Sequence, residues 1–182
     1  MNPSVDLSTF NNQDYQPGSK WKRVTWYIVN AILFDSWIPN YGIKRIALRL
    51  WGAKVGRNVI IKPRVNIKYP WKLSIGDHTW IGEGVWIDNL DNITIGKNCC
   101  LSQGVMLLCG NHRYDLTTFD LFTQPITIAD GAWIGAKSTI LPGTQIGEHA
   151  VIQAGITFHG KADPYIIIGQ KKEHGFRKRN LQ

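Results

Sequence analysis

Large apolar residues recur at every sixth position over much of the chain. The spacing of six residues holds throughout, except for two slips of two residues and one long interruption. The positions are Val55, Ile61, Ile67, Ile75, Ile81, Ile87, Ile95, Leu101, Leu107, Ile128, Ile134, Ile140, Ile146, Ile152 and Phe158. A period this short indicates one small structural unit stacked on itself many times.

The residue four places after each large one is usually smaller, as at Val59, Thr79 and Ala132. One large inward residue per short strand and one smaller residue per corner predict a triangular coil of three hexads, and hence about five coils. Glycine often follows the large residue, as at Gly56 and Gly76, and we interpret these as tight corners that need its backbone freedom. A β-sandwich is the alternative, but its turns do not keep a strict phase of six residues.

The length of 182 residues suggests one main domain. We expect a flexible N-terminus over residues 1–19 and a helical, membrane-proximal cap over residues 20–52. The repeats then extend over residues 53–170, with an inserted loop at 108–125, and a basic tail occupies residues 171–182.

The region before the repeats predicts two helices. The stretch from Trp21 to Phe34 is apolar and aromatic, but it is shorter than the roughly 20 apolar residues of a membrane span. A second helix over residues 43–50 places four apolar residues on one stripe, namely Ile43, Ile46, Ala47 and Leu50. We expect these helices to cap the open first coil. The Trp-rich face, flanked by Lys and Arg, also fits contact with an anionic membrane surface.

The net charge of +8 lies mostly outside the repeats. Nucleic acid is not the expected partner, because no recognition helix or RNA-binding signature accompanies the basic residues. Three interpretations of the basic residues remain: they contact an anionic membrane, they bind the phosphates of a nucleotide-like cofactor, or they simply face solvent. The three cysteines show no metal-ligand spacing, and their number fits the reducing cytosol. The polar N-terminus lacks a signal peptide, so we expect a cytoplasmic protein, peripheral at the inner face of the membrane.

The hexads closely resemble those of the hexapeptide-repeat acyltransferases. Three further segments, Arg49-Leu50-Trp51-Gly52-Ala53, Trp86-Ile87-Asp88-Asn89-Leu90 and His112-x-Tyr114-Asp115, resemble the colanic-acid-type sugar O-acetyltransferases of exopolysaccharide biosynthesis. The resemblance implies an all-β, left-handed parallel β-helix and a homotrimer with its sites at subunit interfaces. It also implies acetyl-CoA as cosubstrate and a sugar or lipid-linked glycan as acceptor.

The interruption between Leu107 and Ile128 holds the chemistry that the resemblance implies, because inserted loops on rigid scaffolds often carry function. His112 matches the general base of the family, and imidazole titrates close to physiological pH. It would take a proton from the acceptor hydroxyl as that group attacks the thioester directly, without an acyl-enzyme. The candidates for holding the acceptor are Asp88, Asn89, Tyr114 and Asp115. Either aspartate is also a candidate for orienting the imidazole, or is simply a turn residue.

The last coils match the acetyl-CoA-binding coils of the family. The candidates on the cofactor side are Trp133, Ala136, Ala154, Lys172 and Arg177. The stretch from Phe158 to Lys161 departs from the family pattern, so two alternatives stay open: N-acetylation of an amino sugar or other small acceptor, and an inactive trimeric scaffold. A metal site is not expected, because the chain lacks the closely paired histidines of a carbonic anhydrase. A serine triad is also not expected, because no nucleophile-elbow sequence is present.

Overall fold

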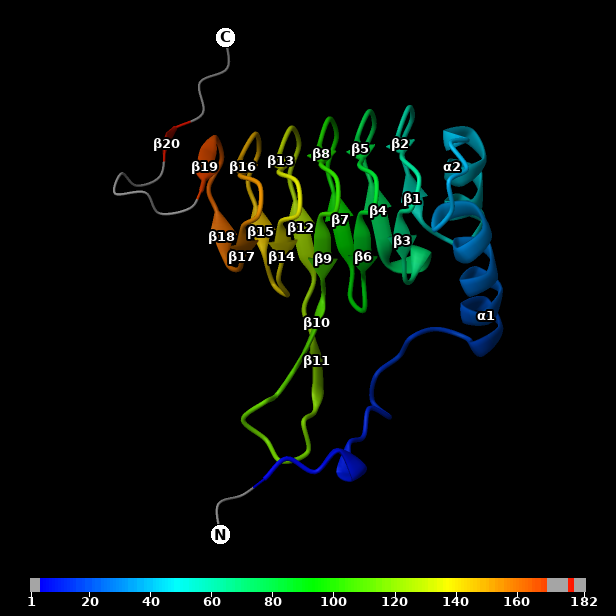
Figure 1. The fold of residues 1–182 in the computed structure, drawn as a ribbon, viewed down its shortest axis with the longest axis vertical. Coiled ribbons are helices and arrows are strands. Elements are labelled where there is room, and N and C mark those ends of the chain that lie inside the picture. The colour runs from blue at the N-terminus through cyan, green and yellow to red at the C-terminus, as the bar shows by residue number, and fades with distance from the viewer. Residues whose placement is uncertain (1–3, 170–176, 179–182) are drawn as a thin grey trace.

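The strands wind into a parallel β-helix with three sheets (Figure 1). The computed structural model describes residues 4–169 and 177–178. The first sheet contains β1 (Lys54–Val55), β4 (Leu73–Ile75), β7 (Ile93–Ile95), β12 (Ile126–Ile128), β15 (Gln145–Ile146) and β18 (Lys161–Ala162). The second contains β2 (Ile60–Ile61), β5 (Trp80–Ile81), β8 (Cys100–Leu101), β13 (Trp133–Ile134), β16 (Val151–Ile152), β19 (Ile166–Ile168) and β20 (Arg177–Lys178). The third contains β3 (Asn66–Ile67), β6 (Trp86–Asp88), β9 (Met106–Leu108), β14 (Thr139–Ile140) and β17 (Thr157–Phe158).

Successive coils pair in parallel, so that each strand lies beside the strand one coil further along. Five full coils and a partial sixth, formed by β18 and β19, follow from this order. The predicted β-helix of about five coils is confirmed, and the sandwich alternative is excluded by the parallel pairing. Only β20 departs from this pattern within the helix sheets described, because it pairs antiparallel with β19.

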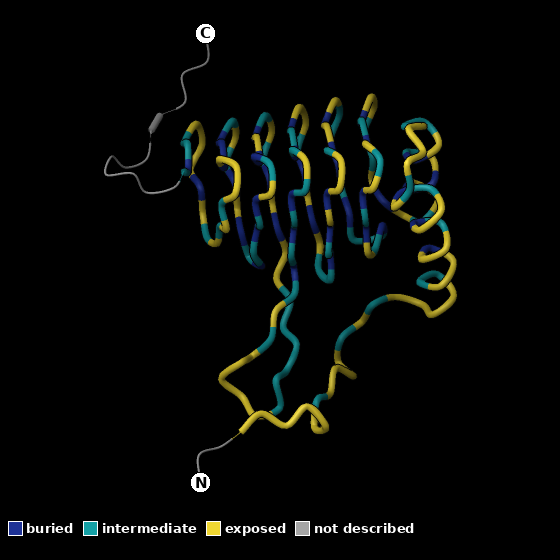
Figure 2. The backbone as a smooth tube through the Cα atoms, viewed as in Figure 1, coloured by how far each residue is buried: buried dark blue, intermediate teal, exposed yellow. Residues whose placement is uncertain are grey.

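The predicted hexad residues form the core of the coils. Thirteen of the fifteen are buried, and the other two, Val55 and Phe158, pack against the core at its two ends. Figure 2 shows the alternation of buried and exposed segments around each coil. Each coil therefore contributes one large residue per sheet to a continuous apolar column.

The glycines that follow the large residues are required by the close approach of successive coils. A Cβ atom on Gly76 would lie 2.6 Å from the carbonyl carbon of Gly96 in the next coil. None of these glycines has a positive φ, whereas His78 (φ 61°) and Asn98 (φ 53°) do. Our interpretation that they provide backbone freedom is therefore wrong for these positions. They leave out a side chain where two backbones meet.

Two helices and a π-helical turn close the N-terminal end of the coils (Figure 1). They are α1 (Lys20–Val29), η2 (Asn30–Phe34) and α2 (Tyr41–Leu50). Ser19 and Asn40 cap the two α-helices, because their side-chain oxygens accept from Lys22 N and Ile43 N. Short 3-10 turns lie at η1 (Leu7–Thr9) and η3 (Pro70–Lys72). None of the described helices is long and apolar enough to cross a membrane.

The cap supplies hydrogen-bond donors to the carbonyl groups at the open edge of the first coil. Each coil donates backbone N–H groups to carbonyls of the next, as Ile60 N does to Thr79 O. The carbonyls of the first coil therefore have no earlier coil to pair with, and such an edge needs donors. Four side chains of the cap supply them: Trp26 Nε1 to Ile67 O at 2.6 Å, Lys44 Nζ to Lys62 O at 3.0 Å, Arg45 Nη1 to Val59 O at 2.9 Å, and Arg49 Nη2 to Val55 O at 2.8 Å.

The need for hydrogen-bond donors determines which face of α2 lies against the first coil, and this face is not the one that the apolar stripe predicts. We predicted one apolar stripe on this helix, but only Ala47 of that stripe is buried. Lys44 is fully buried instead, while Ile46 is 56% and Leu50 75% exposed. Lys44 and Arg45 face the coil because its carbonyls need donors, beside the buried Ala47 and Leu48, and Ile43, Ile46 and Leu50 are left exposed.

Candidate active site

The interruption between the third and fourth coils folds as an antiparallel hairpin that projects away from the β-helix (Figure 1). Its strands are β10 (Gly110–His112) and β11 (Leu121–Thr123). The hairpin leaves the β-helix at the end of β9 in the third sheet, and the chain rejoins the β-helix at β12 in the first sheet. His112 stands at the far end of the ladder, opposite Leu121, beside the hairpin tip.

The imidazole of His112 is held in one tautomer. Its Nδ1 atom lies 2.9 Å from the carbonyl oxygen of Phe119. Since a carbonyl only accepts, Nδ1 donates to it, and in the neutral ring the lone pair then belongs to Nε2. The ring of Phe119 also stacks on the imidazole, with centroids 4.3 Å apart and planes 7° from parallel. Phe119 has φ 52°, so the turn at the hairpin tip brings both its carbonyl and its ring to the histidine.

An N-terminal segment over residues 5–18, here called the strap, lies along the hairpin and the nearby corner. Asp6 N donates to Thr117 O at 2.9 Å, and the ring of Phe10 lies 5.7 Å from that of His112. Tyr15 OH donates to Leu90 O at 2.8 Å. The sequence offered no signal for the contact of Phe10, because no periodicity connects the first residues with the inserted loop.

Asp88 lies beside the root of the hairpin. Its carbonyl accepts from Cys109 N at 3.2 Å. Its carboxylate Oδ1 is buried and lies 2.8 Å from the ammonium of Lys68, in an ion pair without the geometry of a good hydrogen bond. The negative charge at this corner is thus balanced by a half-exposed lysine from the preceding coil.

The other acceptor-side candidates are not among the described contacts of the imidazole ring. Asn89 is fully buried, and its amide accepts from Tyr69 N and donates to Tyr69 O, so it holds the corner together. Asp115 binds Arg113 through two hydrogen bonds, which lower the pKa of its carboxyl. Tyr114 is 82% exposed. Among the described contacts of the His112 ring, the polar partner is a backbone carbonyl and neither predicted aspartate takes part.

The cofactor-side candidates lie at a different corner. Ala136 and Ala154 occupy adjacent coils between the second and third sheets, where Gly155 N donates to Ala136 O at 2.8 Å. Trp133, on the second sheet, is 47% exposed and donates its indole N–H to Ser102 Oγ at 2.9 Å. Lys172 and the side chain of Arg177 lie outside the described residues.

Small residues make the corner at Ala136 and Ala154 smooth and open. A Cβ atom added to Gly155 would meet nothing within 4 Å. The two alanines and Gly155 therefore leave this part of the corner without large side chains. Within one chain the structure does not join this corner to His112, because the hairpin leaves from the corner between the third and first sheets.

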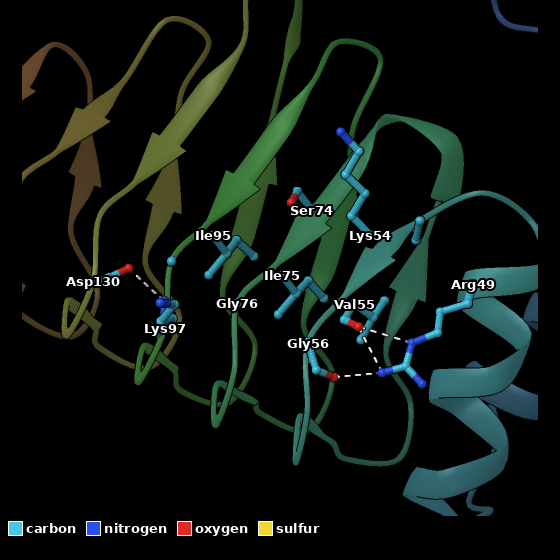
Figure 3. A pocket seen from close by; sticks show the side chains of 12 residues that line it. Arg49, Lys54, Val55, Gly56, Ser74, Ile75, Gly76, Ile95, Lys97 and Asp130 are labelled. Atoms are coloured by element: carbon cyan, nitrogen blue, oxygen red, sulfur yellow. Dashed lines mark hydrogen bonds between the residues drawn. The ribbon is translucent and has the colours of Figure 1, made fainter.

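Other parts of the described surface offer weaker sites. An open groove of about 560 Å³ runs along the first sheet beside Arg49, Lys54 and Asp130, but none of the predicted site residues lines it (Figure 3). The described residues contain no cluster of His, Cys, Asp or Glu able to hold a metal ion. Cys109 is buried, and burial raises its thiol pKa to about 12.

Comparison with known sequences places these features in a family. The hexapeptide repeat of succinyl-transferases matches residues 72–109, and the bacterial transferase hexapeptide (six repeats) matches residues 125–157. WcaF of Escherichia coli, named as a colanic acid biosynthesis acetyltransferase, is 38% identical over 152 residues, covering 82% of this chain and 83% of WcaF. The chain belongs to the hexapeptide-repeat acyltransferases.

Another curated protein and two solved structures are also similar to this chain. The galactoside O-acetyltransferase of E. coli is 32% identical, over 63% of this chain and 58% of that protein. A galactoside acetyltransferase solved in complex with coenzyme A superposes with a TM-score of 0.73 at 26% identity, covering 88% of this chain and 80% of that one. A hexapeptide-repeat acetyltransferase from Vibrio cholerae has the same left-handed β-helix, with a TM-score of 0.75 at 20% identity, over 81% and 85% of the two chains.

Proposed function

We propose that the protein transfers an acetyl group from acetyl-CoA to a hydroxyl of a sugar in exopolysaccharide biosynthesis. The observation that carries this proposal is the fixed tautomer of His112 on the projecting hairpin, which leaves Nε2 as a base. The names of WcaF and the galactoside O-acetyltransferase support a sugar acceptor and attack by oxygen. The complex of the galactoside enzyme with coenzyme A supports acetyl-CoA as donor.

His112 acts as general base and then as general acid. Its Nε2 atom takes the proton of the acceptor hydroxyl while that oxygen attacks the thioester carbonyl. The C–S bond then breaks, and the imidazolium returns the proton to the departing thiolate. Phe119 holds Nδ1–H throughout, so the charge that forms on the ring is stabilised by the carbonyl and the ring stays in place. No acyl-enzyme is needed, because the thioester is already activated.

We propose a homotrimer whose sites lie between subunits. Three half-exposed tryptophans, Trp80, Trp86 and Trp133, stand on the outward faces of the second and third sheets. The first sheet shows mainly polar residues outward, such as Ser74, Thr94 and Thr127 in its register. An apolar face of this kind marks a protein contact. Because the cofactor corner and His112 lie at different corners, a neighbouring subunit is needed to bring them together.

The acceptor is proposed to lie between the hairpin and the corner of Asp88, with Tyr114 and Asp115 at its outer edge. Asn89 belongs to this proposal as the residue that fixes the corner. Trp133, Ala136 and Ala154 form the donor side, and we keep Lys172 and Arg177 as partners for the phosphates of coenzyme A. The enzyme works in the cytoplasm, peripherally at the inner face of the membrane, where a lipid-linked glycan is available.

The test is release of free thiol from acetyl-CoA with a panel of sugars, comparing wild type with His112→Gln. Loss of a general base should lower kcat by roughly 10²–10⁴-fold. Unchanged turnover in the variant would refute the assignment of the base. If only amino sugars are acetylated, the proposed O-acetylation would have to be replaced by N-acetylation. Absence of both turnover and coenzyme A binding by calorimetry would favour an inactive scaffold, and a monomer by light scattering would remove the interfacial site.

A further inference from the structure

We propose that the outward surface of the N-terminal cap docks on an anionic lipid bilayer. This outer cap face is defined by its six most exposed large apolar residues: Trp21, Tyr27, Ile32, Trp37, Ile46 and Leu50, each between 56% and 81% exposed. The inference deepens the membrane location given under the proposed function, and it does not depend on the acetyl-transfer chemistry.

The inner side of the cap holds both polar and apolar side chains, while its outer side keeps a large apolar surface exposed. Its inner side carries Lys44 and Asn30, both buried, together with the donors to the edge of the first coil. Asn30 contacts the backbone N–H of Ile67 at 3.1 Å and Asn66 at 3.0 Å. The inward positions are therefore filled, both by these polar groups and by the buried apolar residues Trp26, Phe34, Ala47 and Leu48, and the other large apolar residues of the cap remain exposed.

Side-chain contacts join the two helices of the cap into one unit. Trp51, just after α2, donates its indole N–H to Thr25 of α1 at 3.2 Å and packs on Trp26. At the other end, the ammonium of Lys44 lies over the ring of Phe34. Figure 2 shows long exposed stretches along both helices. Large exposed apolar patches on a helical surface mark an interaction site, and aromatic residues beside aliphatic ones suit the headgroup region.

Charge selects the partner. Residues 20–54 contain seven Lys or Arg against one acidic residue, Asp35. Lys44 is buried, so six basic side chains (20, 22, 23, 45, 49 and 54) are at least partly exposed, and this segment presents a net charge of +5. A polybasic surface beside apolar side chains is attracted to anionic lipid headgroups. A second copy of this surface would repel it, because both copies carry the same positive charge. The cap also closes one end of the coil axis. A trimer whose three-fold axis is parallel to that axis therefore turns three such faces to the same side.

The experiment is cosedimentation of the full-length protein with vesicles of phosphatidylcholine, with and without 30 mol% phosphatidylglycerol. We expect binding to the anionic vesicles, weaker binding to neutral ones, and loss of binding as salt increases. The double variant I46E/L50E should bind at least about ten-fold more weakly. Leu7→Glu is the matched control, since Leu7 is a similarly exposed leucine on the strap, 64% exposed, and it should bind as wild type does.

Thermal melting and acetyl transfer to a soluble sugar are measured on the same variants. An unchanged melting temperature shows that I46E/L50E is folded, and its soluble turnover separates docking from chemistry. Equal binding of I46E/L50E and wild type would overturn the proposal. So would equal binding to neutral and anionic vesicles, or a change in oligomeric state of the double variant by sedimentation velocity, which would make the face a contact between copies. If neither wild type nor the variants acetylate any sugar, the vesicle experiment still tests whether the cap binds the membrane.

Discussion

The stacking of Phe119 on His112 allows a measurable prediction about the proposed general base. Replacing Phe119 by Leu removes the ring but keeps the carbonyl that accepts from Nδ1, because that carbonyl belongs to the backbone. Both residues adopt a positive φ at a similar cost, so the conformation of the turn is not favoured or disfavoured by the change. The substitution therefore isolates the effect of the ring.

The size of the effect follows from the geometry. A stacked aromatic pair contributes about 0.5–1.5 kcal/mol beyond the burial of its area, and the centroid distance of 4.3 Å with planes 7° apart is a close stack. If the stack holds the imidazole in its reactive orientation, losing it should lower kcat/KM by about two- to thirteen-fold, at roughly 1.36 kcal/mol per factor of ten. This loss is far smaller than that expected for removing His112 itself.

A double-mutant cycle gives the decisive assay. Thiol release is measured for wild type, F119L, H112Q and the double variant, with Leu116→Ala as a control in the same hairpin tip. F119L should be silent in the H112Q background, because the ring acts only through the imidazole. An equal loss in both backgrounds, or no loss in either, would refute the positioning role. The nitrogen chemical shifts of the His112 ring give a second readout that needs no acceptor: Nδ1 should stay protonated in both wild type and F119L.

Three further outcomes test the scaffold around the site. Gly76→Ala should lower the free energy of unfolding by about 1–3 kcal/mol or more in chemical denaturation, since its Cβ would collide with the backbone of Gly96; Gly42→Ala in α2, where the added atom meets only the Asn40 side chain at 3.4 Å, should not lower it. Burial raises the pKa of Tyr15 above its usual value, so the hydrogen bond to Leu90 should stabilise the protein below about pH 10 and lose that effect as the pH rises further. Melting of Tyr15→Phe should show a loss of about 0.5–1.5 kcal/mol at neutral pH and none of this alkaline dependence. Cys109 should resist alkylation in the folded protein at pH 8, as mass spectrometry of labelled peptides would reveal, because only the thiolate reacts and its pKa is about 12.

The coils could be predicted from the sequence because one short rule governs each of them. A residue such as Ile81 is buried in the same way as Ile61 and Leu101, its neighbours in the adjacent coils. The periodicity therefore reports a local packing requirement repeated many times. The reason for the glycines could not be found in this way, because a collision between Gly76 and Gly96 depends on how closely two coils approach.

The role of His112 stays a prediction, and only its surroundings can be compared with what the sequence indicated. The position of His112 in the interruption was visible in the sequence, but its partners were not. We looked for a carboxylate, and the structure instead provides the backbone carbonyl of Phe119, which any residue at that position would carry. Asp115 pairs with Arg113, two residues away in the same turn. A backbone partner leaves no signature in side-chain identity, and so sequence patterns cannot indicate it.

The orientation of α2 shows why an apolar stripe does not by itself identify a buried face. Periodicity reports that one side of a helix differs from the other, and the usual inference places the apolar side inward. Here the neighbour is the open edge of a coil, whose carbonyls need hydrogen-bond donors. Lys44 and Arg45 satisfy Lys62 O and Val59 O only if they point inward, which forces Ile46 and Leu50 outward. The same hydrogen-bonding requirement that closes the scaffold therefore creates the apolar, positively charged surface from which we infer membrane docking.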